Sequence, residues 1–475
     1  MNLMEDSKDF RKWGYRFVDY LADYFDNIEE YPVKSSVEPG SIKAAFPKQA
    51  PNHPQSMEES LEMITSKIIP GLTHWQHPRF HAYFPANTSY ASILGELLIA
   101  GFGVQAMIWE TSPAAAELEE VVMEWLKNLL DLPAEWSGVI QDTASTANLV
   151  ALLTAREKKT NYSINEKGFK AANYRIYCSE HAHSSIDKAV KIAGFGSSNL
   201  IKIAVNGSLE MLPEELEKQI NKDIDEGLIP FLVVAALGTT SSVAIDPIEE
   251  IASITAKYDL WLHVDAAYAG NAMILPEFRK EIGSLSGVDS FVFNPHKWMF
   301  TNFDLSAYFV KDKKALINTF SILPEYLRTD SYGKVNDYRD WGIQLGRRFR
   351  ALKLWLVFQS FGVDRMRELI REHIHLGEWF ENQVKENTNF ELVLPRVLNV
   401  IVFRHILTED PDQFNARLLK ELNDSGKMYL SHSVINGKYV LRMVTGNTRV
   451  KKHHIQSSWD QIVETAKRLM LTSDK

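Results

Sequence analysis

Short apolar segments alternate with helix-patterned stretches between residues 80 and 350 of this 475-residue chain. Six of these segments have the length and the β-branched or aromatic content of strands: 175–179, 200–205, 231–237, 260–264, 291–293 and 306–310. Strands that are apolar along their whole length are buried on both faces, and intervening helices supply the crossovers of a parallel sheet. The alternation therefore predicts an α/β fold with a mostly parallel sheet and helices on both faces.

The N-terminal region has a different pattern. Residues 9–30 place apolar side chains at steps of three and four, which predicts an amphipathic helix. A proline-rich linker follows, and a second helix is predicted near 57–68. We expect residues 1–80 to form a helical arm that packs on a partner subunit.

The C-terminal third is predicted to be α+β. A helix is expected at 347–382, followed by strands near 398–404, 428–433 and 439–444. Arg347 and Arg348, at the start of that helix, are expected to form structural ion pairs. The expected domains are the arm, a large domain over 81–350 and a smaller domain over 351–475.

Composition and charge exclude several classes of protein. The net charge is −9, and no long basic stripe carries interleaved aromatic residues, so we expect no nucleic-acid partner. The single cysteine, Cys178, excludes a disulfide within the chain and favours a reducing, cytoplasmic location. The apolar stretch 89–109 contains Glu96 and Gln105, which favours a buried helix pair or a subunit interface over a membrane span.

Polar side chains follow several of the predicted strands at their carboxyl ends. Asp265 ends one strand, Lys297 follows the next, His183 follows the strand at 175–179, and Thr240 follows the strand at 231–237. In an open α/β sheet, the carboxyl ends of the strands meet at the edge where ligands bind. The sequence thus predicts a carboxylate, an amine, an imidazole and a hydroxyl at one edge.

A buried amine and a carboxylate on either side of a flat aromatic group indicate pyridoxal phosphate. The aromatic neighbours of Lys297 are expected to favour the neutral amine, which attacks the cofactor aldehyde. Asp265 would keep the pyridine nitrogen protonated, and the small Ala267 would let the ring lie flat. His183 would stack on the opposite face.

The segment 141–146 supplies a candidate phosphate site. It turns through Asp142-Thr143-Ala144-Ser145 and enters a predicted helix, whose first N–H groups and hydroxyls suit an anion. No nucleotide-type glycine motif is present, so the phosphate is expected to belong to another kind of ligand.

Each residue taken singly has a simpler interpretation. Lys297 alone would be a snorkelling lysine, Asp265 a helix cap and His183 a satisfied polar residue. Cys178, His181 and His183 suggest zinc, but a fourth ligand is not evident in the sequence, so no metal is expected.

Seven motifs occur together in one order: QDTASTANLVALLTAR, HAHSSIDKA, LGTTSSVAIDP, WLHVDAAYAG, FNPHKWMF, LPEYLR and LGRRFRALKLW. The set resembles the group II pyridoxal-phosphate-dependent decarboxylases and is most similar to the aromatic-L-amino-acid decarboxylases. The resemblance implies a lyase of fold type I with a central seven-stranded sheet. It also implies a homodimer with the active site at the subunit interface.

The same resemblance implies roles for individual residues. Lys297 would form the Schiff base, Asp265 would pair with the pyridinium and His183 would stack on the ring. The other matched cofactor positions are Thr143, Ala144, Ser145, Thr240, Ala267, Asn294 and His296. Tyr326 matches the loop tyrosine that protonates the substrate carbon after carbon dioxide leaves, whereas aldehyde-forming relatives carry phenylalanine there.

Substrate class also follows from the resemblance. The matched pocket positions are Trp75, Tyr83, Phe84, Pro85 and Gly346, which favour an aromatic amino acid. Ala86, Gln105 and Met107 depart from the pattern of the animal members, so the individual aromatic substrate stays open. Decarboxylation of glutamate, histidine or an aliphatic amino acid, and aromatic aldehyde synthesis, are the alternatives.

Overall fold

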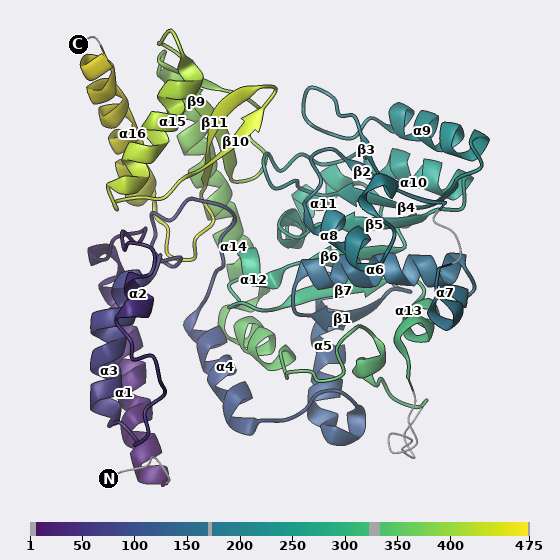
Figure 1. Cartoon of the computed structure of the whole chain (residues 1–475), viewed down its shortest axis with the longest axis horizontal. Helices are drawn as coiled ribbons and strands as arrows, with labels where there is room; N and C mark the ends of the chain where they lie inside the picture. Colours follow the sequence, from purple (N-terminus) through teal and green to yellow (C-terminus); the bar gives the residue numbers. More distant parts are fainter. Residues whose placement is uncertain (1–5, 170–172, 323–332, 474–475) are drawn as a thin grey trace. The chain divides into compact units, whose positions relative to one another are not determined.

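The computed structural model describes residues 6–169, 173–322 and 333–473 (Figure 1). It divides into two compact units. The first unit comprises Met1–Pro85, Trp379–Val393 and Val402–Lys475, and the second comprises Ala86–Glu378 and Leu394–Ile401. The division into an arm and two domains that we expect from the sequence stays a prediction.

A seven-stranded sheet forms the centre of the second unit (Figure 1). Its strands lie in the order β1 (Ser137–Gln141), β7 (Ser306–Val310), β6 (Ser290–Phe293), β5 (Trp261–Asp265), β4 (Ile229–Ala236), β2 (Tyr174–Ser179) and β3 (Leu200–Ile203). The pairs from β6 to β3 are all parallel, and β7 runs antiparallel to both β6 and β1. The predicted α/β fold with a mostly parallel seven-stranded sheet is confirmed.

The central strands are buried along almost their whole length, as their apolar sequences require. All of β6 and β7 is buried, and β5 is buried up to Val264. Helix α6 (Ala144–Lys159) packs against β1 and β4 to β7, α9 (Pro213–Asp225) and α10 (Ile248–Lys257) pack against β4, and α5 (Pro113–Leu129) packs against β1. The helices thus remove the apolar faces of the sheet from water.

Shorter helices complete the second unit. They are α7 (Ser163–Lys167), α8 (Ser185–Ile192), α11 (Pro276–Ile282), α12 (Pro295–Trp298) and α13 (Lys313–Phe320). Of these, α12 is the single turn that follows β6 and carries Lys297.

Helices and a second sheet make up most of the first unit. Its helices are α1 (Ser7–Asp26), α2 (Ser41–Ala44), α3 (Met57–Met63), α15 (Pro411–Asp424) and α16 (Lys452–Ser473). The sheet has the order β10 (Ser431–Ile435), β11 (Lys438–Val444), β9 (Val400–His405) and β8 (Phe390–Leu392), with β9 crossing the boundary between the units. These elements confirm the helical N-terminal region and the α+β C-terminal region.

The helix predicted over 347–382 differs from the structure. Helical conformation spans Ala351–Glu386 as α14, and Gly362 interrupts it with φ 68° and ψ 159°. Glycine adopts this conformation without the steric cost that a Cβ atom imposes, so the chain changes direction there.

The apolar stretch 89–109 forms neither a membrane span nor a buried helix pair. It contains one 13-residue helix, α4 (Tyr90–Phe102), which Gly103 ends in a left-handed conformation. Leu94, Leu97 and Phe102 on this helix are all more than half exposed. Throughout the described ranges, no helix combines the length and the apolar character that crossing a membrane requires.

One buried ion pair, between Arg347 and Glu119, connects α5, β1 and the segment before α14. Arg347 Nη2 donates to Glu119 Oε1 at 2.7 Å and to the carbonyl of Ile140 at 2.7 Å. Glu119 Oε1 also accepts the backbone N–H of Ile140 at 2.8 Å. Arg347 and Arg348 both form ion pairs, as expected.

We predict that Arg347→Met lowers the free energy of unfolding by about 3–5 kcal/mol, because it leaves the Glu119 carboxylate buried without its cation. The matched control is Arg371→Met, which breaks an exposed pair with Glu277 of the same 2.7 Å length and should cost less than about 1 kcal/mol. Urea unfolding of both variants measures the difference. Equal losses would contradict the structural role of the buried pair.

Candidate active site at the carboxyl ends of the strands

Asp265 and Lys297 lie at the ends of neighbouring parallel strands. Asp265 is the last residue of β5 and pairs in register with Val292 of β6. Lys297 lies five residues beyond Val292, in the single turn α12. The pairing therefore brings the carboxylate and the amine to the same edge of the sheet, as the sequence predicts.

The Asp265 carboxylate is held at both oxygens. Oδ2 accepts a hydrogen bond from the Asn148 side-chain amide at 2.9 Å, and Oδ1 accepts the backbone N–H of Ala267 at 3.1 Å. Asn148 lies on the buried face of α6, and the partly buried Ala267 follows Asp265 on the same loop. Both contacts leave the carboxylate in a fixed orientation at the end of β5.

Lys297 is partly buried, and its neighbours fix the turn that carries it. The backbone N–H of Lys297 donates to the carbonyl of Asn294 at 2.9 Å. The next residue, Trp298, is fully buried and stacks on Tyr268 with ring centroids 5.0 Å apart. The Trp298 indole also donates to His373 Nδ1 at 2.8 Å. These contacts set the position of the Lys297 backbone.

His183 follows β2 at the same edge. Its Nδ1 lies 2.8 Å from Ser185 Oγ and accepts the Ser185 backbone N–H at 3.1 Å. The side chain is exposed, yet desolvation lowers its pKa; the Asp265 carboxylate opposes this shift and the Lys297 ammonium adds to it. Ser185 Oγ also accepts from Asn148 Nδ2 at 3.0 Å, and Asn148 donates to Asp265, so hydrogen bonds connect His183 to Asp265.

The predicted phosphate residues lie at the start of α6 and after β6. Thr143 is the N-cap of α6, and its Oγ1 accepts the Thr146 N–H at 3.3 Å. Ala144 is buried, Ser145 is exposed, and the side-chain oxygen of the buried Asn294 accepts from Ser306 Oγ at 2.6 Å. A helix start with adjacent hydroxyl and amide groups is suited to a phosphate.

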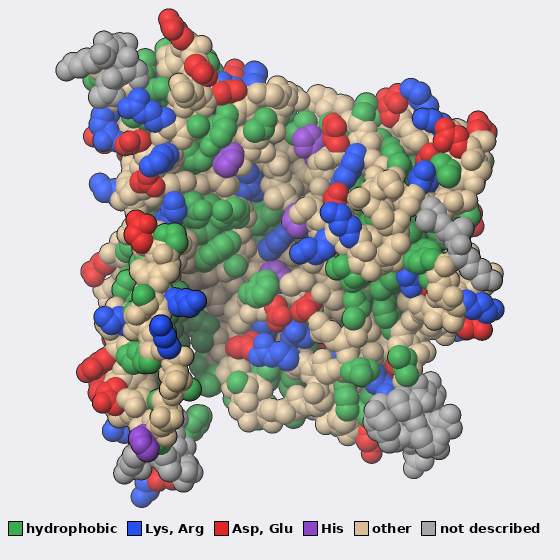
Figure 2. Space-filling model, viewed as in Figure 1, with side chains coloured by type: hydrophobic (Ala, Val, Ile, Leu, Met, Phe, Trp, Pro, Cys, Tyr) green, Lys and Arg blue, Asp and Glu red, His purple; other side chains and the backbone are tan. Residues whose placement is uncertain are grey.

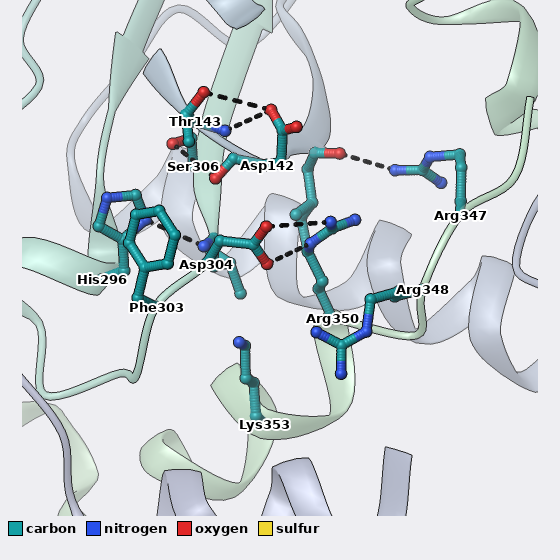
Figure 3. A network of polar contacts seen from close by, with 12 residues as sticks. Asp142, Thr143, His296, Phe303, Asp304, Ser306, Arg347, Arg348, Arg350 and Lys353 are labelled. Carbon is teal, nitrogen blue, oxygen red and sulfur yellow. Dashed lines mark hydrogen bonds and ion pairs between the residues drawn. The ribbon is translucent and has the colours of Figure 1, made fainter. Parts of the chain in front are cut away.

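The His296 side chain contacts the loop that follows α12 (Figure 3). Its Nδ1 accepts the backbone N–H of Leu305 at 2.9 Å, and its ring lies 4.7 Å from that of Phe303. Burial, together with the Lys297 charge, lowers the pKa of His296 to about 3. The imidazole is therefore neutral near pH 7 and holds the loop between β6 and β7.

Two other predicted positions have distinct surroundings in the second unit. Thr240 is exposed, whereas its neighbour Thr239 is buried and bonds to Ser242 Oγ at 3.0 Å. Gly346 lies beside Gln105: a Cβ atom added to this glycine would be 3.4 Å from Gln105 Nε2. Gln105 Oε1 in turn accepts the backbone N–H of Arg347.

The predicted aromatic pocket residues lie together in the first unit. Trp75 stacks on Tyr83 with centroids 5.8 Å apart, and Arg442 lies 4.6 Å from the ring of Phe84. Phe84 and Pro85 are buried, while Trp75 and Tyr83 are exposed. Tyr326 lies outside the described residues.

Sequence reasoning missed Asn148. It lies one helical turn after Ala144 and one before Ala151, on the face of α6 that packs on the sheet. A polar residue in that otherwise small and apolar row was the available signal, because a buried amide requires partners.

The described residues contain one group with the composition of a metal site, formed by Glu29, His453 and His454 of the first unit. His454 Nδ1 accepts the backbone N–H of Lys451 at 2.9 Å. The neutral ring therefore carries its proton on Nε2, which lies 3.1 Å from Glu29 Oε1. This geometry is that of a histidine–carboxylate pair and leaves Nε2 no lone pair for a metal.

The donor set at the strand ends fits pyridoxal phosphate. A fixed carboxylate suits a pyridinium N–H, an amine in the turn after the adjacent strand suits an aldehyde, and a capped helix start suits the phosphate. Ala267 beside Asp265 has no side chain large enough to obstruct a flat ring.

Comparisons with known proteins agree with this chemistry. The model of the pyridoxal-dependent decarboxylase conserved domain matches residues 39–406. Tyrosine decarboxylase 1 of Narcissus pseudonarcissus is 42% identical over 98% of this chain and 94% of its own. Phenylacetaldehyde synthase of Arabidopsis thaliana is 41% identical over 98% of this chain and 97% of its own.

A solved structure shows the same fold. The crystal structure of Oryza sativa TDC with PLP and tryptamine superposes with a TM-score of 0.96 at 34% identity, covering 99% of this chain and 100% of that one. Sequence, fold and site chemistry thus agree over nearly the whole chain, which belongs to the pyridoxal-dependent decarboxylase family, carboxy-lyases whose cofactor is pyridoxal 5′-phosphate.

Proposed function

We propose that this enzyme decarboxylates an aromatic L-amino acid and releases the corresponding amine and carbon dioxide. The observation that carries the proposal is the placement of Asp265 and Lys297 at the ends of the paired strands β5 and β6. The substrate class is supported by the printed activities of the relatives, tyrosine decarboxylase among them, and by tryptamine in the rice complex.

Each site residue then has a defined task. The bound cofactor supplies an aldehyde for amino groups and a protonated ring that withdraws electrons from the substrate α-carbon. Lys297 would provide the amine that holds the cofactor in the resting enzyme, and Asp265 would accept a hydrogen bond from the pyridine N–H. Thr143, Ala144, Ser145 and Asn294 would hold the phosphate, and His183 would stack on the ring.

Proton delivery is assigned to Tyr326. After carbon dioxide leaves, the substrate α-carbon needs one proton, and the phenol of Tyr326 would donate it. Thr240, Ala267 and His296 complete the cofactor surroundings.

The aromatic substrate preference is further supported by the ring cluster of the first unit. The ring of Trp75 contacts both Phe80 and Tyr83, at centroid distances of 4.4 Å and 5.8 Å. The positions that we assign to substrate side-chain recognition are Trp75, Tyr83, Phe84, Pro85 and Gly346. Stacked and edge-to-face rings favour another aromatic group over a charged or aliphatic one.

We also propose a cytoplasmic homodimer with the active site at the subunit interface. The exposed apolar row of α4, which includes Leu94, Leu97 and Phe102, supports a second copy as its occupant. The buried, reduced Cys178 supports a reducing compartment. Lys and Arg side chains are interspersed with Asp and Glu over the face in Figure 2, which supports a small-molecule substrate rather than nucleic acid.

A panel of L-amino acids tests the proposed function. The protein with added pyridoxal phosphate should convert tyrosine, DOPA, tryptophan or phenylalanine to its amine, as detected by mass spectrometry. Activity confined to glutamate, histidine or an aliphatic amino acid would contradict the substrate class. Ammonia and hydrogen peroxide in place of amine would identify an aldehyde synthase.

Lys297→Ala should abolish turnover while leaving noncovalent cofactor binding measurable, because only the covalent attachment is removed. Borohydride treatment of the wild-type holoenzyme, followed by peptide mapping, should place the cofactor label on Lys297. The exposed Lys188→Ala, on the neighbouring helix α8, is the control and should keep full activity. A label on another lysine would overturn the assignment.

Tyr326→Phe should slow amine release and raise the yield of aldehyde, because the α-carbon loses its proton donor and becomes open to attack by oxygen. The measurement is the ratio of amine to aldehyde, with ammonia and peroxide quantified in the same reactions. Tyr162→Phe, in the second unit, controls for the loss of a hydroxyl. An unchanged product ratio and rate would exclude Tyr326 as the donor.

A further inference from the structure

Asn148 is the centre of a buried hydrogen-bond network beneath the candidate active site. It is 2% exposed and lies on the face of α6 that contacts β5. Its Nδ2 donates to Asp265 Oδ2 at 2.9 Å and to Ser185 Oγ at 3.0 Å. Its Oδ1 lies 2.8 Å from His263 Nε2. All three polar positions of the amide thus have partners.

The Asp265 carboxylate determines which way the amide is oriented. An ionised carboxylate only accepts hydrogen bonds, so the Nδ2 group of Asn148 must face it. The second Nδ2 hydrogen then points to Ser185, and Oδ1 is left facing His263. Because Oδ1 only accepts, His263 must carry a proton on Nε2.

The contacts at the far end of the network are compatible with this assignment. The Trp261 indole only donates, and it donates to Ser290 Oγ at 2.8 Å. Ser290 Oγ also lies 2.8 Å from His263 Nδ1, so its own hydroxyl hydrogen is available for that nitrogen. Burial lowers the pKa of His263 to about 4, and the neutral ring has one proton, on Nε2. The donor and acceptor assignments from the two ends agree.

The near end of the network reaches His183. Ser185 Oγ accepts from Asn148, so its hydroxyl hydrogen is directed at His183 Nδ1, 2.8 Å away. The backbone N–H of Ser185 also donates to this nitrogen. His183 Nδ1 is therefore an acceptor, and the neutral ring carries its proton on Nε2.

We propose that Asn148 is a positioning residue that joins Asp265 and His183 through one hydrogen-bond network of fixed direction. It holds the carboxylate at Oδ2, and through Ser185 it helps to hold His183 as the tautomer protonated on Nε2. His183 then presents a hydrogen-bond donor to its ligand and not a base. This inference rests on the proposed function, because Asp265 and His183 are the cofactor-facing residues in it.

An apolar residue at position 148 would remove one hydrogen-bond partner from each of three groups. Asp265 Oδ2 and Ser185 Oγ would lose a donor, and His263 Nε2 would lose its acceptor. Unpaired buried polar groups are unfavourable, and the loss is larger when one of them is charged. The geometry around Asp265 would therefore relax away from the orientation that the pyridine nitrogen requires.

Nitrogen-15 NMR of the histidine-labelled apoprotein tests the tautomers without any cofactor. In the wild type, His183 and His263 should both show an unprotonated Nδ1 and a protonated Nε2 near pH 7.5. In Asn148→Leu, His263 should lose this single tautomer, whereas His183 should retain it because the Ser185 N–H remains. A wild-type His183 protonated on Nδ1 would overturn the proposal.

Cofactor affinity supplies the second readout. Pyridoxal phosphate should bind Asn148→Leu roughly tenfold more weakly than wild type, in line with losing a hydrogen bond to a charged group. Thr154→Val is the matched control. Thr154 is buried on the same helix, and in the described part of the chain its hydroxyl bonds to the carbonyl of Val150 alone. The cofactor affinity of this variant and the tautomers of His183 and His263 should therefore stay unchanged. Wild-type affinity in Asn148→Leu would contradict the proposal.

Asn148→Asp separates the donor role from the acceptor role and guards against a folding defect in the leucine variant. It keeps an acceptor for His263, so that tautomer should persist, but it replaces the donor to Asp265 with a second carboxylate. Cofactor binding at pH 8 should again be roughly tenfold weaker. Wild-type affinity in this variant would also overturn the proposal. Failure of the wild type itself to bind cofactor at Lys297 or to release amine would instead contradict the proposed function.

Discussion

The parallel pairing of β5 with β6 is the constraint on which the site depends. It aligns Asp265 with Val292, so the chain leaves both strands at the same edge and delivers a carboxylate and an amine together. The attraction between the two side chains does not create this proximity, because Asp265 and Lys297 are far apart in the sequence. Backbone hydrogen bonding between two buried apolar strands brings them together. The surrounding helices stabilise this strand pair by burying both faces of the sheet.

Buried polar groups near the strand ends must be satisfied by the protein itself. Asn148, His263 and Ser290 meet this requirement for one another beneath Asp265, and His296 and Asn294 meet it for the loops around Lys297. Such networks determine side-chain orientation and also contribute to stability. Each side chain in the network has one orientation that pairs its donors with acceptors. The protein's polar interior is thus part of how the site is oriented.

Helix α4 exposes apolar side chains on one side and packs closely on the other. A helix whose mean composition is apolar would be buried within most single chains, yet Leu94 and Phe102 face outward here. Its small residue, Gly95, instead contacts the backbone of Lys353, where an added Cβ would approach within 2.6 Å. Close packing on one side and apolar exposure on the other are consistent with the second copy that we propose.

The sequence by itself determined six of the seven strands of the large sheet, the residues at their carboxyl ends and the capped start of α6, but it did not mark β1 as a strand. Apolar runs, turn residues and motif order are local properties that can be recognised without knowing which strands pair. Gly362 shows the limit of that approach: the residues around it have helical periodicity, and only the observed φ reveals the break. Asn148 shows it too, since nothing in the sequence indicates that its amide meets Asp265, 117 residues away. Strand order, buried partners and the tautomers that they impose depend on contacts between distant segments, and these only the tertiary structure decided.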